Sequence, residues 1–174
     1  MQRSSEIRFR DIYERHQRAV TVYVRRRVAP DSVDDVVAET FLVCWRKLDQ
    51  VPREPLPWLY EVARKTLANH HRTTAPRHGL VGSQPTEDAF LPVERDDVLA
   101  RAFAQLSEAD REVLRLVAWE QLSLRAAALA LDCSPVACRV RLHRAKRRLA
   151  SHLAELEAPD AAATRRSQPK GATS

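Results

Sequence analysis

Helical spacing of apolar residues is the feature that most constrains the fold of this chain. Outside one segment, apolar side chains recur three or four residues apart, and no stretch alternates as a half-buried strand does. Glycine occurs only 3 times, which leaves little material for glycine-rich phosphate loops or closed β-barrels. We therefore expect an all-α protein. The predicted helices span residues 8–27, 32–48, 57–72, 97–106, 107–119, 124–131 and 134–156.

The one segment without helical spacing of apolar residues has the composition of a linker. Residues 73–95 contain three prolines and two of the three glycines, and they show no sustained hydrophobic period. The sequence thus predicts two small helical domains, residues 1–72 and 97–157, joined by a flexible linker at 73–96. The polar tail at 158–174 is expected to be disordered.

Four serines stand where helix N-caps are expected. A serine hydroxyl at such a position accepts a hydrogen bond from a free backbone amide of the first turn. Pro135 follows one of them at the first helical position, where its missing amide costs nothing. A short helix, the turn at 132–134 and a longer basic helix then form a helix-turn-helix signal. The predicted caps are Ser32, Ser107, Ser123 and Ser134.

Positive charge is concentrated in two blocks. The chain has a net charge of +6 and a pI near 9.7, a surplus that favours a polyanionic partner. Residues 1–72 and 98–156 each carry a surplus of basic groups, whereas 73–97 is acidic. Nucleic acid and an anionic membrane surface are the partners that this surplus suggests.

The last predicted helix has an apolar face and a basic face. Cys138, Leu142, Ala145 and Leu149 fall on one side and should face the core. The other side combines exposed valines with cations and no acid, which favours insertion into the major groove, where valine meets thymine methyls and arginine reaches guanine or phosphate. A solvated basic surface is the alternative. The candidate DNA contacts are Ser134, Pro135, Val136, Arg139, Val140, Arg141, His143, Arg144 and Arg147.

The helix at 32–48 has a different outer face. Its inward stripe is Val37, Phe41, Cys44 and Leu48, and acids interleave with aliphatic residues opposite this stripe. Carboxylates would repel phosphate, so this face suits a protein partner. Two alternatives stay open: a metal site formed by three acids of the same face, and plain solvated acids near the helix N-terminus. The candidate protein contacts are Asp34, Asp35, Glu39, Leu42 and Arg46, with Val36 and Val43 at the edge.

The spacing of the cysteines and the lack of long apolar runs suggest in which cellular compartment the protein resides. Cys44, Cys133 and Cys138 match no zinc-binding spacing, and the first residues lack the apolar core of a secretory signal. No run approaches the eighteen or so apolar residues of a membrane span. We expect a soluble protein of a reducing compartment, without metal or other cofactor, whose cysteines are small buried hydrophobes.

Three blocks, in this order, resemble one known family. They are DDVVAETFLVCWRKL at 34–48, PWLYEVARKTLANHHR at 57–72, and LSEADREVLRL with LSLRAAALALDCSPVACRVRLHRAKRRL at 106–149. Together they resemble the sigma-70 family of RNA polymerase sigma factors, specifically its two-domain extracytoplasmic-function (ECF) group, over about residues 8–156. Asp132 stands where the family often has glycine, and aspartate tolerates the left-handed conformation that such a turn needs.

The resemblance implies a role for each block. Segment 34–45 would dock on the clamp of the largest polymerase subunit, and the second domain on the flap of the second largest. Residues 49–72 would recognise and open the −10 element through Arg53, Lys65, Asn69 and Arg72, with loop 49–56 capturing a flipped base. The C-terminal helix-turn-helix would read the −35 element. A bacterial, cytoplasmic, non-enzymatic protein with an anti-sigma factor as a further partner is implied.

Two other classes of function compete with this one. A free-standing helix-turn-helix regulator would dimerise or bind a ligand through its N-terminal helices, and it would bind a two-fold symmetric site without polymerase. An enzyme would use the histidines and acids. His70 and His71 are adjacent, however, and point about 100° apart on a helix, which disfavours a shared ligand.

Overall fold

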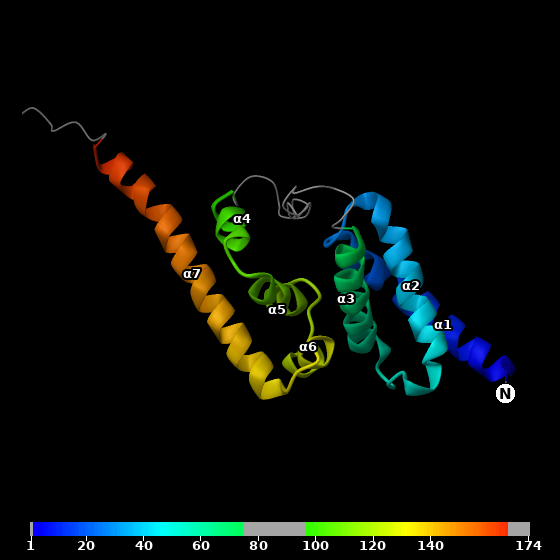
Figure 1. Ribbon diagram of the computed structural model, residues 1–174. Coiled ribbons are helices and arrows are strands. Elements are labelled where there is room, and N and C mark those ends of the chain that lie inside the picture. Colours follow the sequence, from blue (N-terminus) through cyan, green and yellow to red (C-terminus); the bar gives the residue numbers. More distant parts are fainter. Residues whose placement is uncertain (1, 75–96, 167–174) are drawn as a thin grey trace, which may run out of the picture.

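The protein is described by a computed structural model that covers residues 2–74 and 97–166. Within these ranges it contains helices and no strand (Figure 1), which confirms the expected all-α architecture in two regions. Two 3₁₀ turns, Pro30–Ser32 and Leu48–Gln50, flank the second helix. The α-helices are α1 (Gln2–Arg25), α2 (Val33–Arg46), α3 (Pro55–Thr74), α4 (Asp97–Ala104), α5 (Glu108–Ala118), α6 (Leu124–Ala130) and α7 (Pro135–Arg166).

Helices α1, α2 and α3 form the first bundle. Their apolar stripes meet in a core to which α1 contributes Val20 and Val24 and α3 contributes Leu59, all fully buried. The predicted inward stripe of α2 is confirmed, because Val37, Phe41, Cys44 and Leu48 are all buried. Burial of this kind supplies most of the stability of an amphipathic helix in a small domain.

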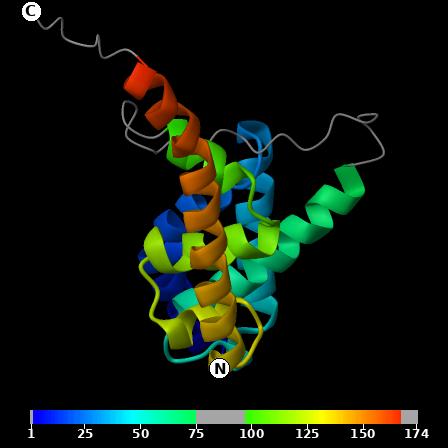
Figure 2. The same ribbon diagram turned by 90° about the vertical axis from the view of Figure 1, so that its left-hand side faces the viewer.

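The second bundle is built around α7. This helix runs past α4, α5 and α6, as Figure 2 shows from the side on which α7 lies in front. Cys138 and Ala145 are fully buried, and Leu142 and Leu149 pack against the core as expected. The opposite side of α7 is left to solvent along its N-terminal half.

Three of the four predicted serine caps are confirmed. The Ser107 hydroxyl accepts from the amide of Asp110 at 3.2 Å, and that of Ser123 accepts from Ala126 at 3.2 Å. Ser134 caps α7 by accepting from the amide of the third helical residue at 3.1 Å. Asp132 has φ 54°, the left-handed conformation that closes the turn between α6 and α7.

The predicted cap at Ser32 is wrong. Ser32 precedes α2 but has φ −97° and ψ −7°, and its side chain makes no capping hydrogen bond. A side-chain cap requires an extended backbone at the N-cap position. Ser32 instead closes the 3₁₀ turn, with its amide donating to the carbonyl of Ala29 at 3.0 Å.

Several helices are longer than the sequence predicts. α1 begins at Gln2 and α3 ends at Thr74, so residues 73–74 of the predicted linker are helical and 75–96 lie outside the described residues. α7 continues to Arg166, through the first half of the predicted disordered tail. Three consecutive alanines at 161–163 favour this continuation. Residues 167–174 lie outside the described part.

The two bundles pack against each other. α3 of the first lies beside α6 of the second, and a single cluster of buried apolar residues runs through both. Leu67 of the first bundle and Leu131 of the second belong to this cluster. The sequence predicted two domains but gave no indication that they would share an interface.

Candidate protein-docking and nucleic-acid interfaces

The N-terminal half of α7 presents an exposed face of mixed apolar and basic character. Val136 is 72% exposed and Val140 44% exposed, and their spacing of one helical turn places the two apolar side chains side by side on the surface. The remaining predicted contacts on this face, Ser134, Pro135, Arg139, His143, Arg144 and Arg147, are exposed as well. The face can therefore offer methyl groups and guanidinium donors to base edges and phosphates.

Two arginines of α7 are placed differently from the rest. Arg141 is half-buried and lines a cavity between the two bundles, so its guanidinium is less available to DNA than predicted. Arg148 forms an ion pair with Asp110, a buried acid of α5. Arg139, Arg144 and Arg147 form no ion pair with any other described residue. These three cations are thus the ones best placed to meet DNA.

The outer face of α2 carries exposed acids and one exposed leucine. Asp34 and Asp35 are exposed, and Leu42 is 47% exposed. Glu39 is half-buried and forms an ion pair with Arg46 at 3.6 Å. This combination of acids around an apolar side chain suits a basic, partly apolar protein surface.

Val36 does not belong to this outer face. It is only 1% exposed and lies in the core, although the sequence placed it at the edge of the protein-contact set. The reason is that α3 packs along this side of α2. Val43, the other edge residue, is half-buried.

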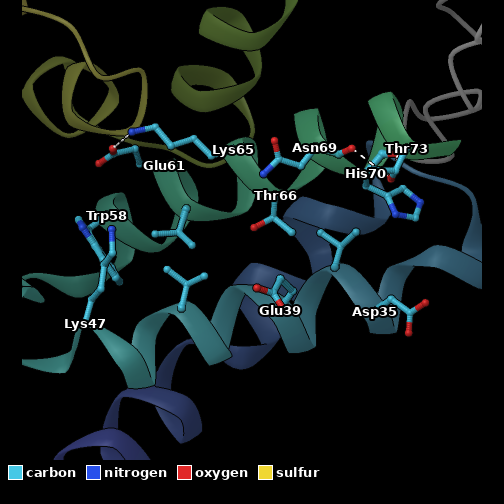
Figure 3. Close-up of a pocket in the computed structure, with 13 residues that line it drawn as sticks. Asp35, Glu39, Lys47, Trp58, Glu61, Lys65, Thr66, Asn69, His70 and Thr73 are labelled. Atoms are coloured by element: carbon cyan, nitrogen blue, oxygen red, sulfur yellow. Dashed lines mark hydrogen bonds and ion pairs between the residues drawn. The ribbon is translucent and has the colours of Figure 1, made fainter. Parts of the chain in front are cut away.

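A groove of about 590 Å³ runs along the surface where α2 and α3 meet. Asp35 and Glu39 line it from α2, and Lys65 and Asn69 line it from α3 (Figure 3). The structure thus brings the predicted protein-contact acids and two of the predicted −10 residues to opposite walls of one groove. Sequence spacing alone could not predict this, since the two sets lie on different helices.

The predicted −10 residues are partly engaged with neighbouring side chains. The ammonium of Lys65 donates to Glu61 on the same helix and to Asp132 of the second bundle, the latter at 3.1 Å. These hydrogen bonds raise the pKa of Lys65 above its ordinary value. Arg72 hydrogen-bonds Asn69. Arg53 lies apart, in a groove of about 660 Å³ that it shares with Pro135.

The described residues offer no ligand cluster for the alternative of a metal site. Among the described residues, no three His, Cys, Asp or Glu side chains come together as ligands. The ring centroids of His70 and His71 lie 6.3 Å apart, and the rings are steeply inclined. No helix in the described ranges combines the length and hydropathy needed to cross a membrane.

Sequence reasoning missed a buried polar cluster between the bundles. We call Tyr23, Arg26 and Arg27 of the first bundle with Glu112 and Glu120 of the second the interdomain cluster. Glu112 accepts hydrogen bonds from the Tyr23 hydroxyl at 2.7 Å and from Arg27 Nε at 2.9 Å. Glu120 accepts from Arg26 Nη1 at 3.1 Å. The side chains of Arg27, Glu112 and Glu120 are 6%, 8% and 5% exposed.

Burial and charge shift the pKa values inside this cluster. Burial, followed by the negative charge of Glu112, raises the pKa of Tyr23. Burial alone would lower the pKa of Arg27, but Tyr23 and Glu112 outweigh it and raise the pKa overall. The arginine and tyrosine therefore keep their protons. In the sequence these residues look like ordinary helical Tyr, Arg and Glu, with no signal that they meet.

Comparisons with known proteins agree on one family. Residues 12–77 match the model of Sigma-70 region 2, and residues 96–149 match that of Sigma-70, region 4. The chain is 32% identical over 160 residues to the RNA polymerase sigma factor NccH of Alcaligenes xylosoxydans xylosoxydans, covering 83% of this chain and 86% of the relative.

Two solved structures share the fold. CnrH in complex with the cytosolic domain of CnrY has a TM-score of 0.58 at 25% identity, covering 83% of this chain and 86% of that one. The sigma factor RpoE of Bartonella quintana, in complex with the anti-sigma factor NepR, has a TM-score of 0.56 at 20% identity, covering 83% and 94%.

Proposed function

Because this chain belongs to the sigma-70 family of RNA polymerase sigma factors, in its ECF group, we propose that its two bundles divide promoter recognition between them. The chain directs RNA polymerase to promoters. The first bundle docks on the polymerase and recognises the −10 element, and the second reads the −35 element.

The exposed face of α7 is the observation that carries the −35 assignment. Val136 and Val140 are exposed there beside Arg139, Arg144 and Arg147, which pair with no carboxylate among the described residues. Valine methyls meet thymine methyls in the major groove, Arg139 reaches base edges, and Arg144 and Arg147 hold phosphates. Ser134 and Pro135 set the start of this helix, as in other recognition helices whose N-terminal residues meet the bases.

The acidic outer face of α2 supports the polymerase-docking assignment. Asp34, Asp35 and Leu42 are exposed together there, and this face docks on the clamp of the largest subunit. The second bundle contacts the flap of the second-largest subunit. Tethering both bundles to polymerase makes the second DNA contact intramolecular, which raises its effective concentration to the millimolar range for a short flexible connection.

The first bundle starts DNA opening without bond chemistry of its own. Arg53, Lys65, Asn69 and Arg72 contact the unpaired non-template strand, and loop 49–56 holds a flipped base. Unstacking a base costs a few kcal/mol, so opening follows from a higher affinity for the single-stranded form than for the duplex. The protein is accordingly a non-enzymatic subunit that acts in the bacterial cytoplasm.

An anti-sigma factor is a further proposed partner. Of the two solved relatives, RpoE is bound to the anti-sigma factor NepR and CnrH is bound to the cytosolic domain of CnrY. This chain shares their fold over most of its length. We extend the same kind of regulation to it, without assigning the surface involved.

Gel-shift titration with and without core polymerase tests the proposed function. We expect promoter-specific complexes only when core enzyme and this chain are both present. Tight binding of the isolated chain to a two-fold symmetric site would instead support a free-standing helix-turn-helix regulator.

Charge reversal on α2 tests the docking face. The double substitution Asp35→Lys/Glu39→Lys should abolish core-polymerase binding in a pull-down and leave the helical circular dichroism spectrum unchanged. Glu6→Lys/Glu14→Lys on the exposed side of α1 makes the same change in net charge and serves as the control. Retained polymerase binding by the α2 variant would move the docking site to another face.

A further inference from the structure

The turn that joins α6 to α7 (Figure 1) is closed by two backbone hydrogen bonds. The amide of Cys133 donates to the carbonyl of Ala128 at 3.0 Å, and the amide of Asp132 donates to that of Leu129 at 3.1 Å. Together with the left-handed φ of 54° at Asp132, these bonds form a Schellman motif at the end of α6. Cys133 is thus the residue that closes α6.

Cys133 also occupies a defined position relative to α7. Ser134 is the N-cap of this helix, because its hydroxyl accepts from the amide of Ala137 at 3.1 Å and its carbonyl accepts from that of Cys138 at 2.9 Å. Cys133 therefore stands directly before the N-cap, and Cys138 is the fourth helical residue. Side chains at these two positions pack against each other and fix the angle at which the chain enters a helix.

The two cysteines differ in exposure. Cys138 is fully buried, as the sequence predicts, whereas Cys133 is half-buried and lines the groove of about 660 Å³. Burial, followed by the neighbouring Cys133, raises the pKa of the Cys138 thiol, and a side-chain hydrogen bond between the two residues contributes to this shift. The two thiols are therefore neighbours, and one of them is open to solvent.

Neither of these thiols has another assigned use in the described part of the chain. Both are free, and no group of three metal-binding side chains is found among the described residues. The bacterial cytoplasm keeps thiols reduced, so a disulfide that forms there is usually transient and responds to oxidants. Two adjacent thiols, one of them accessible, are the arrangement that such a response needs.

We propose that hydrogen peroxide converts Cys133 and Cys138 into a reversible disulfide, and that this bond lowers the affinity of the second bundle for the −35 element. The inference rests on the proposed assignment of the exposed face of α7 to −35 DNA. It adds an oxidant-sensitive site to that surface.

The oxidation proceeds in two steps. The Cys133 thiolate attacks one oxygen of the peroxide, the O–O bond breaks, and the sulfur becomes a sulfenic acid while the departing hydroxide takes the thiol proton and leaves as water. The Cys138 sulfur then attacks the Cys133 sulfur and the S–O bond breaks. The second hydroxide takes the proton of Cys138 and also leaves as water. The two thiols lose two hydrogen atoms, and the peroxide is reduced to two waters.

The disulfide changes the geometry of the turn from which α7 starts. A covalent bond draws the two sulfurs closer together than a contact between thiols does. Cys138 is held in the core, so Cys133 is the residue that moves, and its backbone is tied to the end of α6. Val136 lies inside the segment 133–138 that the bond closes, and Val140 follows one turn later. The reading face of α7 therefore shifts relative to α6.

Peroxide treatment of the full-length chain, followed by peptide mapping, tests whether the bond forms. Both cysteines lie in one tryptic peptide, residues 126–139, which should lose two hydrogen atoms and resist alkylation until dithiothreitol is added. Cys44 is the internal control, because its fully buried thiol lies in another peptide and should remain open to alkylation once the chain is unfolded. A peptide in which both cysteines stay open to alkylation, or in which Cys133 alone gains oxygen, would overturn the proposal.

Promoter binding by the assembled holoenzyme tests the consequence. The chain is oxidised, freed of peroxide and then added to untreated core polymerase. We expect its affinity for promoter DNA to fall about tenfold, which corresponds to the loss of one base contact, and to recover with dithiothreitol. Cys133→Ala should bind promoter DNA equally before and after peroxide treatment, whereas Cys44→Ala should respond as the parent chain does. A disulfide-bonded parent chain with unchanged promoter affinity would contradict the inference.

The outcomes for this site and for the proposed function are distinguishable. Peptide mapping uses the parent chain, so its result depends neither on how a variant folds nor on polymerase. A reduced chain that never supports transcription with core polymerase contradicts the proposed function, whatever its cysteines do. Normal transcription by the reduced chain, together with no disulfide after peroxide treatment, contradicts the present inference alone.

Discussion

Single side chains of α7 fall into two groups that serve different ends. Arg148 is held by the buried Asp110 and belongs to the packing of the second bundle, whereas Arg139 and Arg144 are exposed beside Val140. Arg139, Arg144 and Arg148 have the same side chain and lie on the same helix, so the sequence alone does not distinguish their roles. Only the position of α5 against one side of α7 separates the structural arginine from the DNA-facing ones.

Substitution of Arg144 should weaken DNA binding without changing its sequence preference. If this guanidinium contacts phosphate, Arg144→Ala lowers the slope of log affinity against log salt by about 1 for every promoter. Arg139→Ala should weaken −35 binding as well, with an effect that depends on the sequence. Arg101→Ala removes an exposed arginine of α4 and is the control. An unchanged slope for Arg144→Ala would exclude it from the phosphate contacts.

The buried thiol of Cys44 makes the free energy of unfolding decrease at alkaline pH. Burial raises its pKa from 9.0 to about 11, a shift that Arg8 partly opposes. Because the folded pKa is the higher one, the neutral thiol stabilises the fold below about pH 9, and this contribution is lost as the pH rises through about 11.

Urea denaturation at pH 8.5 and pH 11 measures this loss. The free energy of unfolding should fall by about 2 kcal/mol more in the parent chain than in Cys44→Ala, which has no thiol to ionise. Cys133→Ala, which alters a half-buried cysteine of the second bundle, should keep the full decrease. Equal decreases in the parent and Cys44→Ala would show that this thiol does not carry the effect.

At the scale of elements, the sequence predicts where most helices lie because each stripe of apolar residues must be buried. The inward residues of α2 and α7, and the caps at Ser107, Ser123 and Ser134, follow from local rules alone. Ser32 is the instructive exception. Pro30 begins a 3₁₀ turn directly before α2, and this turn gives Ser32 a helical backbone in which its hydroxyl cannot reach the amides of the first turn.

Alanine substitution at Ser107 should lower the free energy of unfolding more than alanine substitution at Ser32. Ser107→Ala removes a hydrogen bond to the amide of Asp110 and should cost about 1 kcal/mol of unfolding free energy, since the amide loses its acceptor. Ser32→Ala removes no capping bond and should stay within about 0.5 kcal/mol of the parent. Chemical denaturation of both variants decides the matter, and equal losses would contradict the assignment of the caps.

At the scale of the whole molecule, the division into two bundles is readable in the sequence, but their association is not. Proline and glycine at 73–95 mark the boundary because they interrupt the helical period. The interdomain cluster joins residues 85 to 94 positions apart in the chain. No local pattern encodes such a contact, which depends on how two finished surfaces fit.

The burial of Val36 also depends on packing between helices that no local pattern encodes. The angular position of Val36 on α2 put it at the edge of the outer face, yet the approach of α3 buries it. The sequence therefore predicts that α2 carries the candidate docking face, but it does not predict which residues lie at the edge of that face. The predicted α7 residues are exposed, apart from the half-buried Arg141, because the second bundle leaves one side of this helix uncovered.

Run-off transcription by purified core polymerase, over a library of promoter templates, tests whether this chain directs the polymerase to particular promoters. We expect the chain to make the core enzyme start at a defined subset of templates that share −35 and −10 sequences, and neither component to do so alone. Transcripts that are the same with and without the chain would contradict this expectation.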